Sequence, residues 1–189
     1  KDTHSVLGWI EGPIAEYADL RGVEQTMMDL IDNPDMFSKA SDIILENALN
    51  FAQAQVQAGA DMIGVGDAVA SLVGSDIYEK HIMPLHKILF NEIHKLGATV
   101  KLHICGNIEN ILSNIAQTKP DIVDIDSMVE LDTARQKVGT DITLCGNIDP
   151  ISIMLQGTPE QVKDAALACI SKAGKKFILR ITLLLFQRK

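Results

Sequence analysis

Short apolar segments alternate with longer amphipathic segments along the chain. The apolar segments are rich in isoleucine, valine and leucine, which is typical of strands buried on both faces. They lie at residues 6–10, 62–65, 100–105, 122–125, 142–145 and 176–179. The amphipathic segments have the helical period and lie at residues 26–31, 34–58, 84–96, 108–116, 132–138 and 159–173. Because parallel strands need crossover connections, this order predicts an α/β fold with a parallel sheet covered by helices.

Capping residues mark several of the predicted helix boundaries. Asn33 followed by Pro34 favours a helix start, because asparagine caps helices and proline suits the first helical position. Thr158 and Gln161 form a capping-box pattern ahead of the last helix. The helices are expected to end at glycines, namely Gly59, Gly97, Gly139 and Gly174.

Polar side chains collect where the predicted strands end. The residues at these strand ends are Glu11, Asp67, His103, Cys105, Asp126, Asn147 and Asp149. The carboxyl edge of a parallel sheet is the functional edge both in (β/α)8 barrels and in open doubly wound sheets. A Cys-Gly-Asn-Ile sequence occurs at two of these ends, at residues 105–108 and 145–148. The pattern therefore places a site at this edge but leaves both architectures open.

The composition is that of a globular protein. The chain has 189 residues, of which 47% are hydrophobic and 22% are charged. Its 17 basic and 25 acidic residues give a formal charge of -8, and no dense basic run favours a nucleic-acid partner. Residues 177–186 are too short an apolar stretch to span a bilayer, so no membrane association is expected. The three cysteines lack the spacing of a disulfide framework, which indicates reduced thiols and a cytoplasmic protein.

His103 and Cys105 are the most informative candidates for chemistry. They lie two residues apart at the end of a predicted strand, so their side chains are expected on the same face. An imidazole and a thiolate are ligands that zinc prefers, although a catalytic zinc needs three protein ligands. The alternative is a core histidine bonded to a carbonyl group beside a buried thiol.

Other residues have weaker claims. Cys145 ends a strand at the same edge and is a candidate third ligand, but a buried structural cysteine is the more common case. Glu11 and Asp67 are candidate acid–base groups, oxygen ligands or hydrogen-bonded loop residues. Three further histidines on the helices after residue 75 are interpreted as solvated or core-edge residues: His81, His86 and His94.

Several sequence blocks together resemble the uroporphyrinogen decarboxylase superfamily. They are Gly59-Ala60-Asp61, Asp67-Ala68, Pro84, residues 102–107 (Leu-His-Ile-Cys-Gly-Asn), residues 146–150 (Gly-Asn-Ile-Asp-Pro) and residues 157–160 (Gly-Thr-Pro-Glu). The His-x-Cys-Gly-Asn block is similar to that of the corrinoid-dependent methyltransferase branch, which includes the methylcobalamin:coenzyme M methyltransferases. The resemblance extends from about residue 8 to residue 179.

The resemblance implies a (β/α)8 barrel with zinc at the carboxyl ends of its strands. It implies that His103 and Cys105 hold the zinc together with a cysteine just after the last strand. It further implies that zinc activates a small thiol such as coenzyme M, which takes a methyl group from methylcobalamin or another corrinoid on a partner protein. Asn107 and Asn147, in the two repeated blocks, are the candidates for cofactor contacts.

The sequence departs from this family pattern at residue 180. There the family continues with a small residue, glycine and the third zinc cysteine, whereas this chain reads Arg-Ile-Thr-Leu-Leu-Leu. We therefore expect residues 1–179 to form a partial barrel domain of about six strands and residues 180–189 to be an atypical tail. A complete barrel usually needs roughly 250 residues, so the chain is expected to be a fragment.

Three functions follow as hypotheses. The first is zinc-dependent methyl transfer by the parent protein, with the activity of this chain itself left open. The second is a metal-free, uroporphyrinogen decarboxylase-type lyase. The third is a non-catalytic chain that associates through unpaired strand edges and the apolar residues 181–186, which predicts a homo-oligomer.

Overall fold

One parallel sheet organises the fold. The computed structural model describes residues 3–181 and places six strands side by side in chain order. The strands are Leu7–Glu11 (β1), Met62–Gly66 (β2), Thr99–His103 (β3), Ile122–Asp124 (β4), Thr143–Ile148 (β5) and Phe177–Ile181 (β6). Every neighbouring pair is parallel, so the predicted six-stranded parallel sheet is confirmed.

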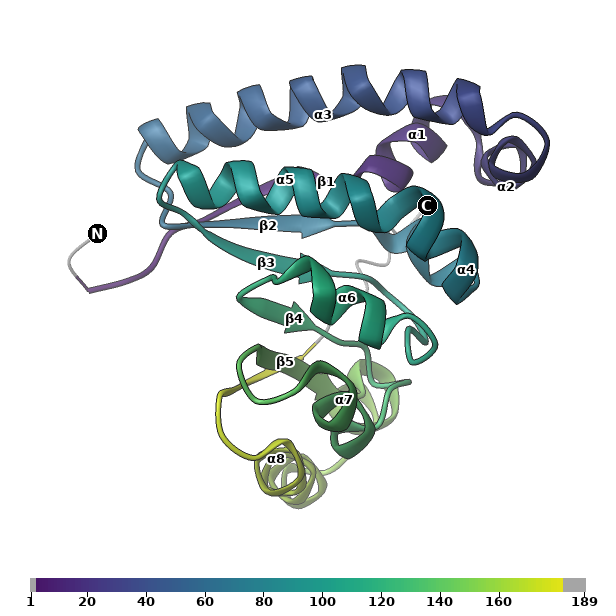
Figure 1. Ribbon diagram of the computed structural model, residues 1–189. Coiled ribbons are helices and arrows are strands. Elements are labelled where there is room, and N and C mark those ends of the chain that lie inside the picture. Colours follow the sequence, from purple (N-terminus) through teal and green to yellow (C-terminus); the bar gives the residue numbers. More distant parts are fainter. Residues whose placement is uncertain (1–2, 182–189) are drawn as a thin grey trace.

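The helices cover one face of this sheet. They are Pro13–Arg21 (α1), Val23–Asp32 (α2), Pro34–Gln57 (α3), Ser75–Ile77 (α4), Met83–Lys95 (α5), Leu112–Thr118 (α6), Leu131–Val138 (α7) and Pro159–Ala173 (α8). Three short 3-10 or π-helical segments complete the described part, namely Ala68–Leu72, Tyr78–Ile82 and Pro150–Leu155. Figure 1 shows α3, α5, α6, α7 and α8 in succession along the sheet, and each of them packs against the next.

The arrangement is that of successive units of a (β/α)8 barrel. An open doubly wound sheet carries helices on both faces and reverses its strand order, whereas here the strands follow the chain order from β1 to β6. The predicted α/β fold of the (β/α)8 barrel family, represented by six strands, is therefore confirmed. Within residues 3–181, no helix is both long and apolar enough to cross a bilayer.

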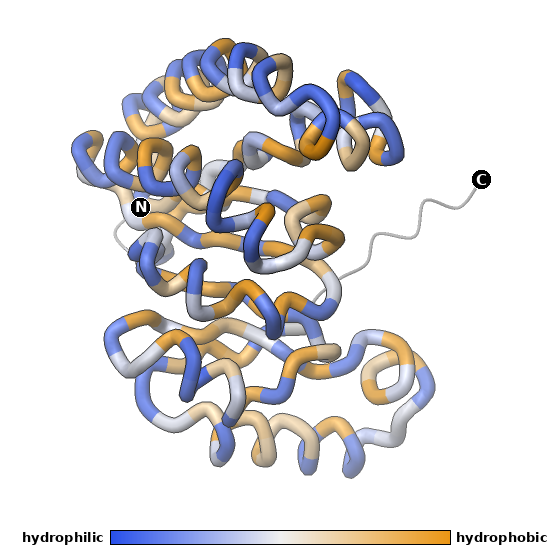
Figure 2. Tube along the Cα trace, turned by 45° about the vertical axis from the view of Figure 1, so that its right-hand side comes forward, coloured by the Kyte–Doolittle hydropathy of each residue, from blue (hydrophilic) through white to orange (hydrophobic). Residues whose placement is uncertain are grey.

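The hydrophobic core lies between the sheet and its helices. Strand residues that point toward the helices are almost wholly buried, among them Ile63, Val65, Val100, Leu102 and Leu144. Figure 2 shows hydrophobic and hydrophilic residues alternating along the helices, as expected for helices that bury one side. We call the opposite, helix-free face of the sheet its inner face. Polar residues are tolerated there because the core lies on the other side.

Trp9 lies flat on the inner face of β2. A Cβ atom added to Gly64 would come within 2.3 Å of the Trp9 ring, and one added to Gly66 within 2.7 Å. The indole Nε1 donates a hydrogen bond to Glu11 Oε1 (3.2 Å), and the ring centroid lies 6.5 Å from that of His103. Two glycines in β2 thus make room for the aromatic side chain beside His103.

Replacing Gly64 with alanine is expected to lower the free energy of unfolding by about 1–3 kcal/mol, because the new methyl group must displace the indole. Urea unfolding followed by the fluorescence of Trp9, the one tryptophan of the chain, measures this change. Gly74→Ala is the matched control, because nothing lies within 4 Å of the Cβ that it adds. Equal stabilities of the two variants would show that Trp9 does not need this space.

The free edge of β1 is covered by a side chain. Gln55 of α3 accepts a hydrogen bond from the Trp9 backbone N–H (2.7 Å) and donates one to the Trp9 carbonyl oxygen (3.0 Å). Both backbone groups of Trp9 are therefore occupied. An unpaired strand edge is a template for association, and Gln55 protects the middle of this one.

Some element boundaries differ from the predictions. Helix α1 has no counterpart among the predicted segments; Pro13 opens it, and its buried residues Ile14, Tyr17 and Ala18 have helical spacing. Residues 108–111 form turns, so the helix expected at 108–116 begins only at Leu112. The capping box of Thr158 and Gln161 is confirmed. Residues 182–189, most of the expected atypical tail and of the expected associating segment, lie outside the described residues.

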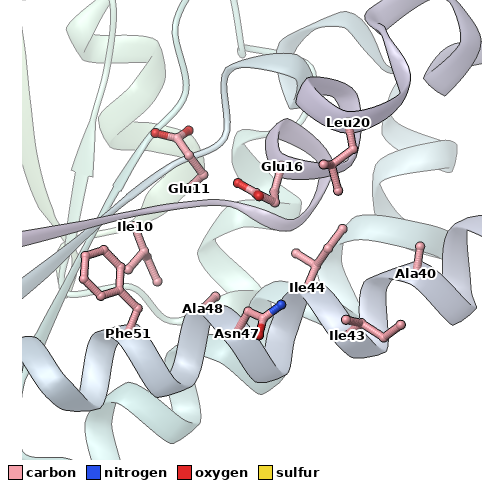
Figure 3. Close-up of a pocket in the computed structure, with 10 residues that line it drawn as sticks. All are labelled: Ile10, Glu11, Glu16, Leu20, Ala40, Ile43, Ile44, Asn47, Ala48 and Phe51. Carbon is pink, nitrogen blue, oxygen red and sulfur yellow. The ribbon is translucent and has the colours of Figure 1, made fainter.

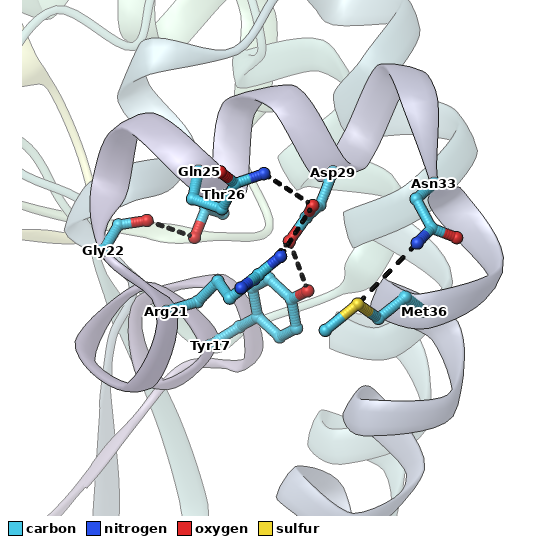
Figure 4. A network of polar contacts seen from close by, with 8 residues as sticks. All are labelled: Tyr17, Arg21, Gly22, Gln25, Thr26, Asp29, Asn33 and Met36. Atoms are coloured by element: carbon cyan, nitrogen blue, oxygen red, sulfur yellow. Dashed lines mark hydrogen bonds and ion pairs between the residues drawn. The ribbon is translucent and has the colours of Figure 1, made fainter.

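A polar network fixes α1 against α2 (Figure 4). Asp29 accepts hydrogen bonds from Arg21 (2.8 Å), Tyr17 (2.8 Å) and Gln25 (2.9 Å). These donors, Arg21 foremost, hold the pKa of the Asp29 carboxyl well below its usual range. Asn33, the expected cap of α3, makes no side-chain capping bond, and its amide instead approaches the sulfur of Met36 (3.7 Å).

Candidate functional site

A single row of paired residues crosses the inner face near the carboxyl ends of the strands. Because register partners in a sheet point to the same face, the side chains of this row lie on one surface. The residues are consecutive partners in β1 to β5, namely Glu11, Gly66, His103, Asp124 and Cys145. Of the seven residues expected at the strand ends, Glu11 and His103 belong to this row, and Gly66, Asp124 and Cys145 complete it.

His103 is held in one orientation. Its Nδ1 lies 3.1 Å from the backbone carbonyl oxygen of Asp124, and because a carbonyl group only accepts, Nδ1 must carry the proton. The lone pair of Nε2 then faces Cys105 Sγ at 3.0 Å. Burial above all, followed by the positive charges of Arg180 and Lys101, lowers the pKa of His103 to about 4. The imidazole is therefore neutral at neutral pH, which is the form that binds metal ions.

Cys105 lies just beyond the end of β3 and is partly exposed. Gly106 follows it with a φ of 85°, a conformation that favours glycine, and the Gly106 N–H donates to Asp126 Oδ2 (3.0 Å). Burial, assisted by the charge of Asp126, raises the pKa of the Cys105 thiol. Without a metal ion Cys105 is therefore protonated, and its S–H can donate to His103 Nε2.

The His103 and Cys105 pair fits two positions of a zinc site. The nitrogen and sulfur donors are of the type that zinc prefers, and the hydrogen bond from Nδ1 to a carbonyl group is the usual outer support of a histidine ligand. Among residues 3–181, however, no group of three or more histidine, cysteine, aspartate or glutamate side chains is arranged to hold a metal. The described residues thus offer one nitrogen and one sulfur donor of the kind that zinc binds, without a third ligand beside them.

Cys145 is not part of such a group. Cys145 is 1% exposed and lies on the inner face of β5, near the Lys101 ammonium. Burial raises the pKa of this thiol, and the Lys101 ammonium opposes that rise. The hypothesis that Cys145 is a third zinc ligand is therefore unsupported. The structure agrees with the alternative, a buried structural cysteine. Cys169 on α8 approaches Asn147 Oδ1 instead (3.7 Å).

Asp67 takes part in a buried network. Its Oδ1 accepts from the Ala15 N–H (2.7 Å) and its Oδ2 lies 2.7 Å from His86 Nε2, while His86 Nδ1 lies 2.8 Å from the Tyr78 hydroxyl. The interpretation of His86 as a solvated or core-edge residue was wrong, since its side chain is 0% exposed. The Asp67 backbone N–H donates to the His103 carbonyl oxygen (2.9 Å), which joins this network to the candidate site.

The remaining sequence candidates have local partners. Glu11 accepts from the Trp9 indole, and partial burial raises the pKa of its carboxyl group. Asn107 Oδ1 accepts from the Glu109 N–H (3.0 Å) in the turn after Cys105. Asn147 donates to the Val129 carbonyl oxygen (2.7 Å). The catalytic roles of Glu11 and Asp67 and the cofactor contacts of the two asparagines stay predictions.

Three charged residues at the site were not among the candidates predicted from the sequence. Asp124 is fully buried, and its carboxylate forms ion pairs with Lys101 (3.0 Å) and with Arg180. Lys101 could have been predicted to lie at the site, because it is two residues before His103 in the same strand and its side chain therefore lies on the same face. The place of Arg180 depends on the pairing of β6 with β5, which the sequence does not reveal.

An apolar groove lies on another part of the molecule. It has a volume of about 370 Å³ and runs along α3 beside β1 and α1 (Figure 3). Ile43, Ile44 and Phe51 of α3 line it, and Glu11 and Glu16 lie at its rim. This groove is on the helix side of the sheet, whereas His103 and Cys105 are on the inner face.

The fold and the site together define a (β/α)-barrel protein with a paired histidine and cysteine at the carboxyl end of β3. The chain belongs to the uroporphyrinogen decarboxylase (URO-D) family, whose model matches residues 1–182. The resemblance inferred from the sequence blocks is therefore confirmed.

Known relatives fall into two groups. The chain is 31% identical over 163 residues to "Methylcobamide:CoM methyltransferase MtbA" of Methanosarcina mazei, an alignment that covers 85% of this chain and 48% of the relative. It is 30% identical over 184 residues to a uroporphyrinogen decarboxylase of Trichodesmium erythraeum, covering 93% and 51%. A solved structure of a methyltransferase from Methanosarcina mazei superimposes with a TM-score of 0.84 at 26% identity, covering 93% and 52%. The chain thus spans about half the length of the relatives it matches.

Proposed function

We propose that the chain is part of a zinc-dependent methyltransferase that moves a methyl group from a methylated corrinoid, carried by a partner protein, to a small thiol such as coenzyme M. The observation that carries this proposal is the pairing of His103 Nε2 with Cys105 Sγ at 3.0 Å. Relatives named as methylcobamide:CoM methyltransferases support the proposed reaction. The homo-oligomer and the cytoplasmic location stay predictions.

The residues at the site have separable tasks. His103 presents a neutral nitrogen whose orientation is fixed by the Asp124 carbonyl group, and Cys105 gives up its proton to become a thiolate ligand. Zinc, when bound, supplies a Lewis acid that keeps a substrate thiol deprotonated at neutral pH. In the transfer, the new sulfur–carbon bond forms as the cobalt–carbon bond of the corrinoid breaks, and cobalt keeps the bonding electron pair.

Methylation of coenzyme M by methylcobalamin, measured as methylated product by mass spectrometry, tests the proposal. We expect Cys105→Ala to lower the rate by more than about 100-fold, since losing even an outer-shell partner of a metal ligand costs about 10- to 100-fold. Cys169→Ala, on the helix side, is the control and should keep the activity of the unaltered chain.

Two outcomes would contradict the proposal. One is a transfer rate that does not change in Cys105→Ala. The other is decarboxylation of uroporphyrinogen without zinc, which the decarboxylase relatives make the alternative function.

A further inference from the structure

Arg180 occupies the inner face beside the candidate metal ligands. It lies in β6 opposite Asn147 of β5, and its guanidinium group forms an ion pair with Asp124. The same Asp124 carboxylate lies 3.7 Å from His103 Nδ1. Arg180 and His103 therefore meet at one buried carboxylate, and Cys105 lies on the other side of the imidazole.

Two cations meet at this carboxylate. Lys101 Nζ lies 3.0 Å from Asp124 Oδ2, so Lys101 and Arg180 share a single buried anion. Asp126 and Glu11 also lie near the pair, and they keep their negative charges because they accept hydrogen bonds only from neutral groups. Arg180 nevertheless brings a second positive charge to the carboxylate beside the imidazole.

The positive charge of Arg180 opposes the binding of a divalent cation at this place. Electrostatic repulsion is strong in a partly buried site, where solvent screens charges less than it does at the surface. The repulsion acts before the third ligand is considered, because it affects any metal ion that His103 and Cys105 would share. An arginine cannot relieve it by losing its proton at ordinary pH.

We propose that Arg180 is a resident cation that weakens zinc binding at the His103 and Cys105 pair of this chain. This inference rests on the proposed function, because it takes the pair to be the zinc ligands. In this role Arg180 contributes no donor atom to the metal. It lowers the zinc affinity of the pair through its positive charge. Removing the charge should therefore strengthen zinc binding without adding a ligand.

Zinc affinity measured by competition with a chromophoric chelator, in buffer free of thiols, tests this inference. Arg180→Gln is expected to bind zinc at least about tenfold more tightly than the unaltered chain, and Arg180→Lys, which keeps the charge, should stay close to it. Lys172→Gln is the matched control, because it removes the same charge from an exposed residue that pairs with Glu130. Lys101→Met is a second variant and should also tighten binding, since it leaves Asp124 with one cation.

The outcomes separate this inference from the proposed function. If Arg180→Gln binds zinc no more tightly than the unaltered chain, the proposed role of Arg180 is overturned, whatever the transfer activity. Tighter binding in Arg180→Gln that persists when Cys105→Ala is added supports the charge effect but shows that zinc sits elsewhere. Zinc binding in none of the variants overturns both. Circular dichroism of each variant establishes that it is folded.

Discussion

Replacing His86 with alanine is expected to lower the free energy of unfolding by about 3–5 kcal/mol, because it opens a cavity in the core and leaves two buried polar groups without a partner. The change leaves the Asp67 carboxylate, which is fully buried, without the ring nitrogen at 2.7 Å. It also removes the partner of the buried Tyr78 hydroxyl (2.8 Å) and the stacking of the imidazole on Phe90, where the ring centroids lie 5.1 Å apart. Equilibrium unfolding in urea measures the loss.

The control for this variant lies on the same helix. His94 of α5 bonds to Asp121 at 2.8 Å, but both side chains are more than a third exposed. His94→Ala should therefore cost less than about 1 kcal/mol, as exposed ion pairs do. If His86→Ala is no more destabilising than His94→Ala, the buried network does not stabilise the fold. Because Asp67 also donates to the His103 carbonyl group, we expect the loss of His86 to loosen the end of β3 as well.

Much of the fold could be predicted because its signals are local. Apolar runs bounded by glycine, proline and polar residues located all six strands, and the capping box of Thr158 located the start of α8. Helix α1 is not predicted from the sequence because Gly12-Pro13 follows an apolar strand segment, and a Gly-Pro pair there is equally typical of a turn. Proline is equally suited to the first turn of a helix, and only the packing of Tyr17 in the core distinguishes the two cases.

Side chains whose environment is set by distant residues could not be predicted. The burial of His86 depends on Asp67, which lies 19 residues earlier, and on the π-helical segment that carries Tyr78. The choice between a barrel and a doubly wound sheet likewise depended on which strands pair. Neither relation leaves a periodic signal in a single sequence.

The candidate site could be predicted only in part. His103 and Cys105 were expected on the same face because of their spacing, and the structure brings their nitrogen and sulfur atoms within 3.0 Å. Cys145 was a weaker candidate for the same reason, and register places it opposite Asp124 beside Lys101 rather than in a three-ligand group. Arg180 could not be assigned to the site from the sequence, because it lies in β6 and its position depends on the pairing of β6 with β5.

The second large effect is expected at Cys105. We expect Cys105→Ala to weaken zinc binding by more than about 100-fold, because it removes a direct ligand, and the loss of outer-shell support alone costs about 10- to 100-fold. Cys145→Ala should leave the affinity almost unchanged, since its thiol faces Lys101. Zinc binding to the unaltered chain should also strengthen as the pH rises, because burial raises the pKa of the Cys105 thiol, which must lose its proton to bind.

Zinc K-edge X-ray absorption of the zinc-loaded chain, in thiol-free buffer, tests the central claim most directly. If His103 and Cys105 are zinc ligands, the spectrum shows one sulfur at about 2.3 Å and an imidazole nitrogen at about 2.0 Å, and the sulfur signal disappears in Cys105→Ala while it persists in Cys145→Ala. A zinc site without sulfur in the unaltered chain, or a sulfur signal that survives in Cys105→Ala, would contradict the assignment of this pair as the metal-binding part of the site.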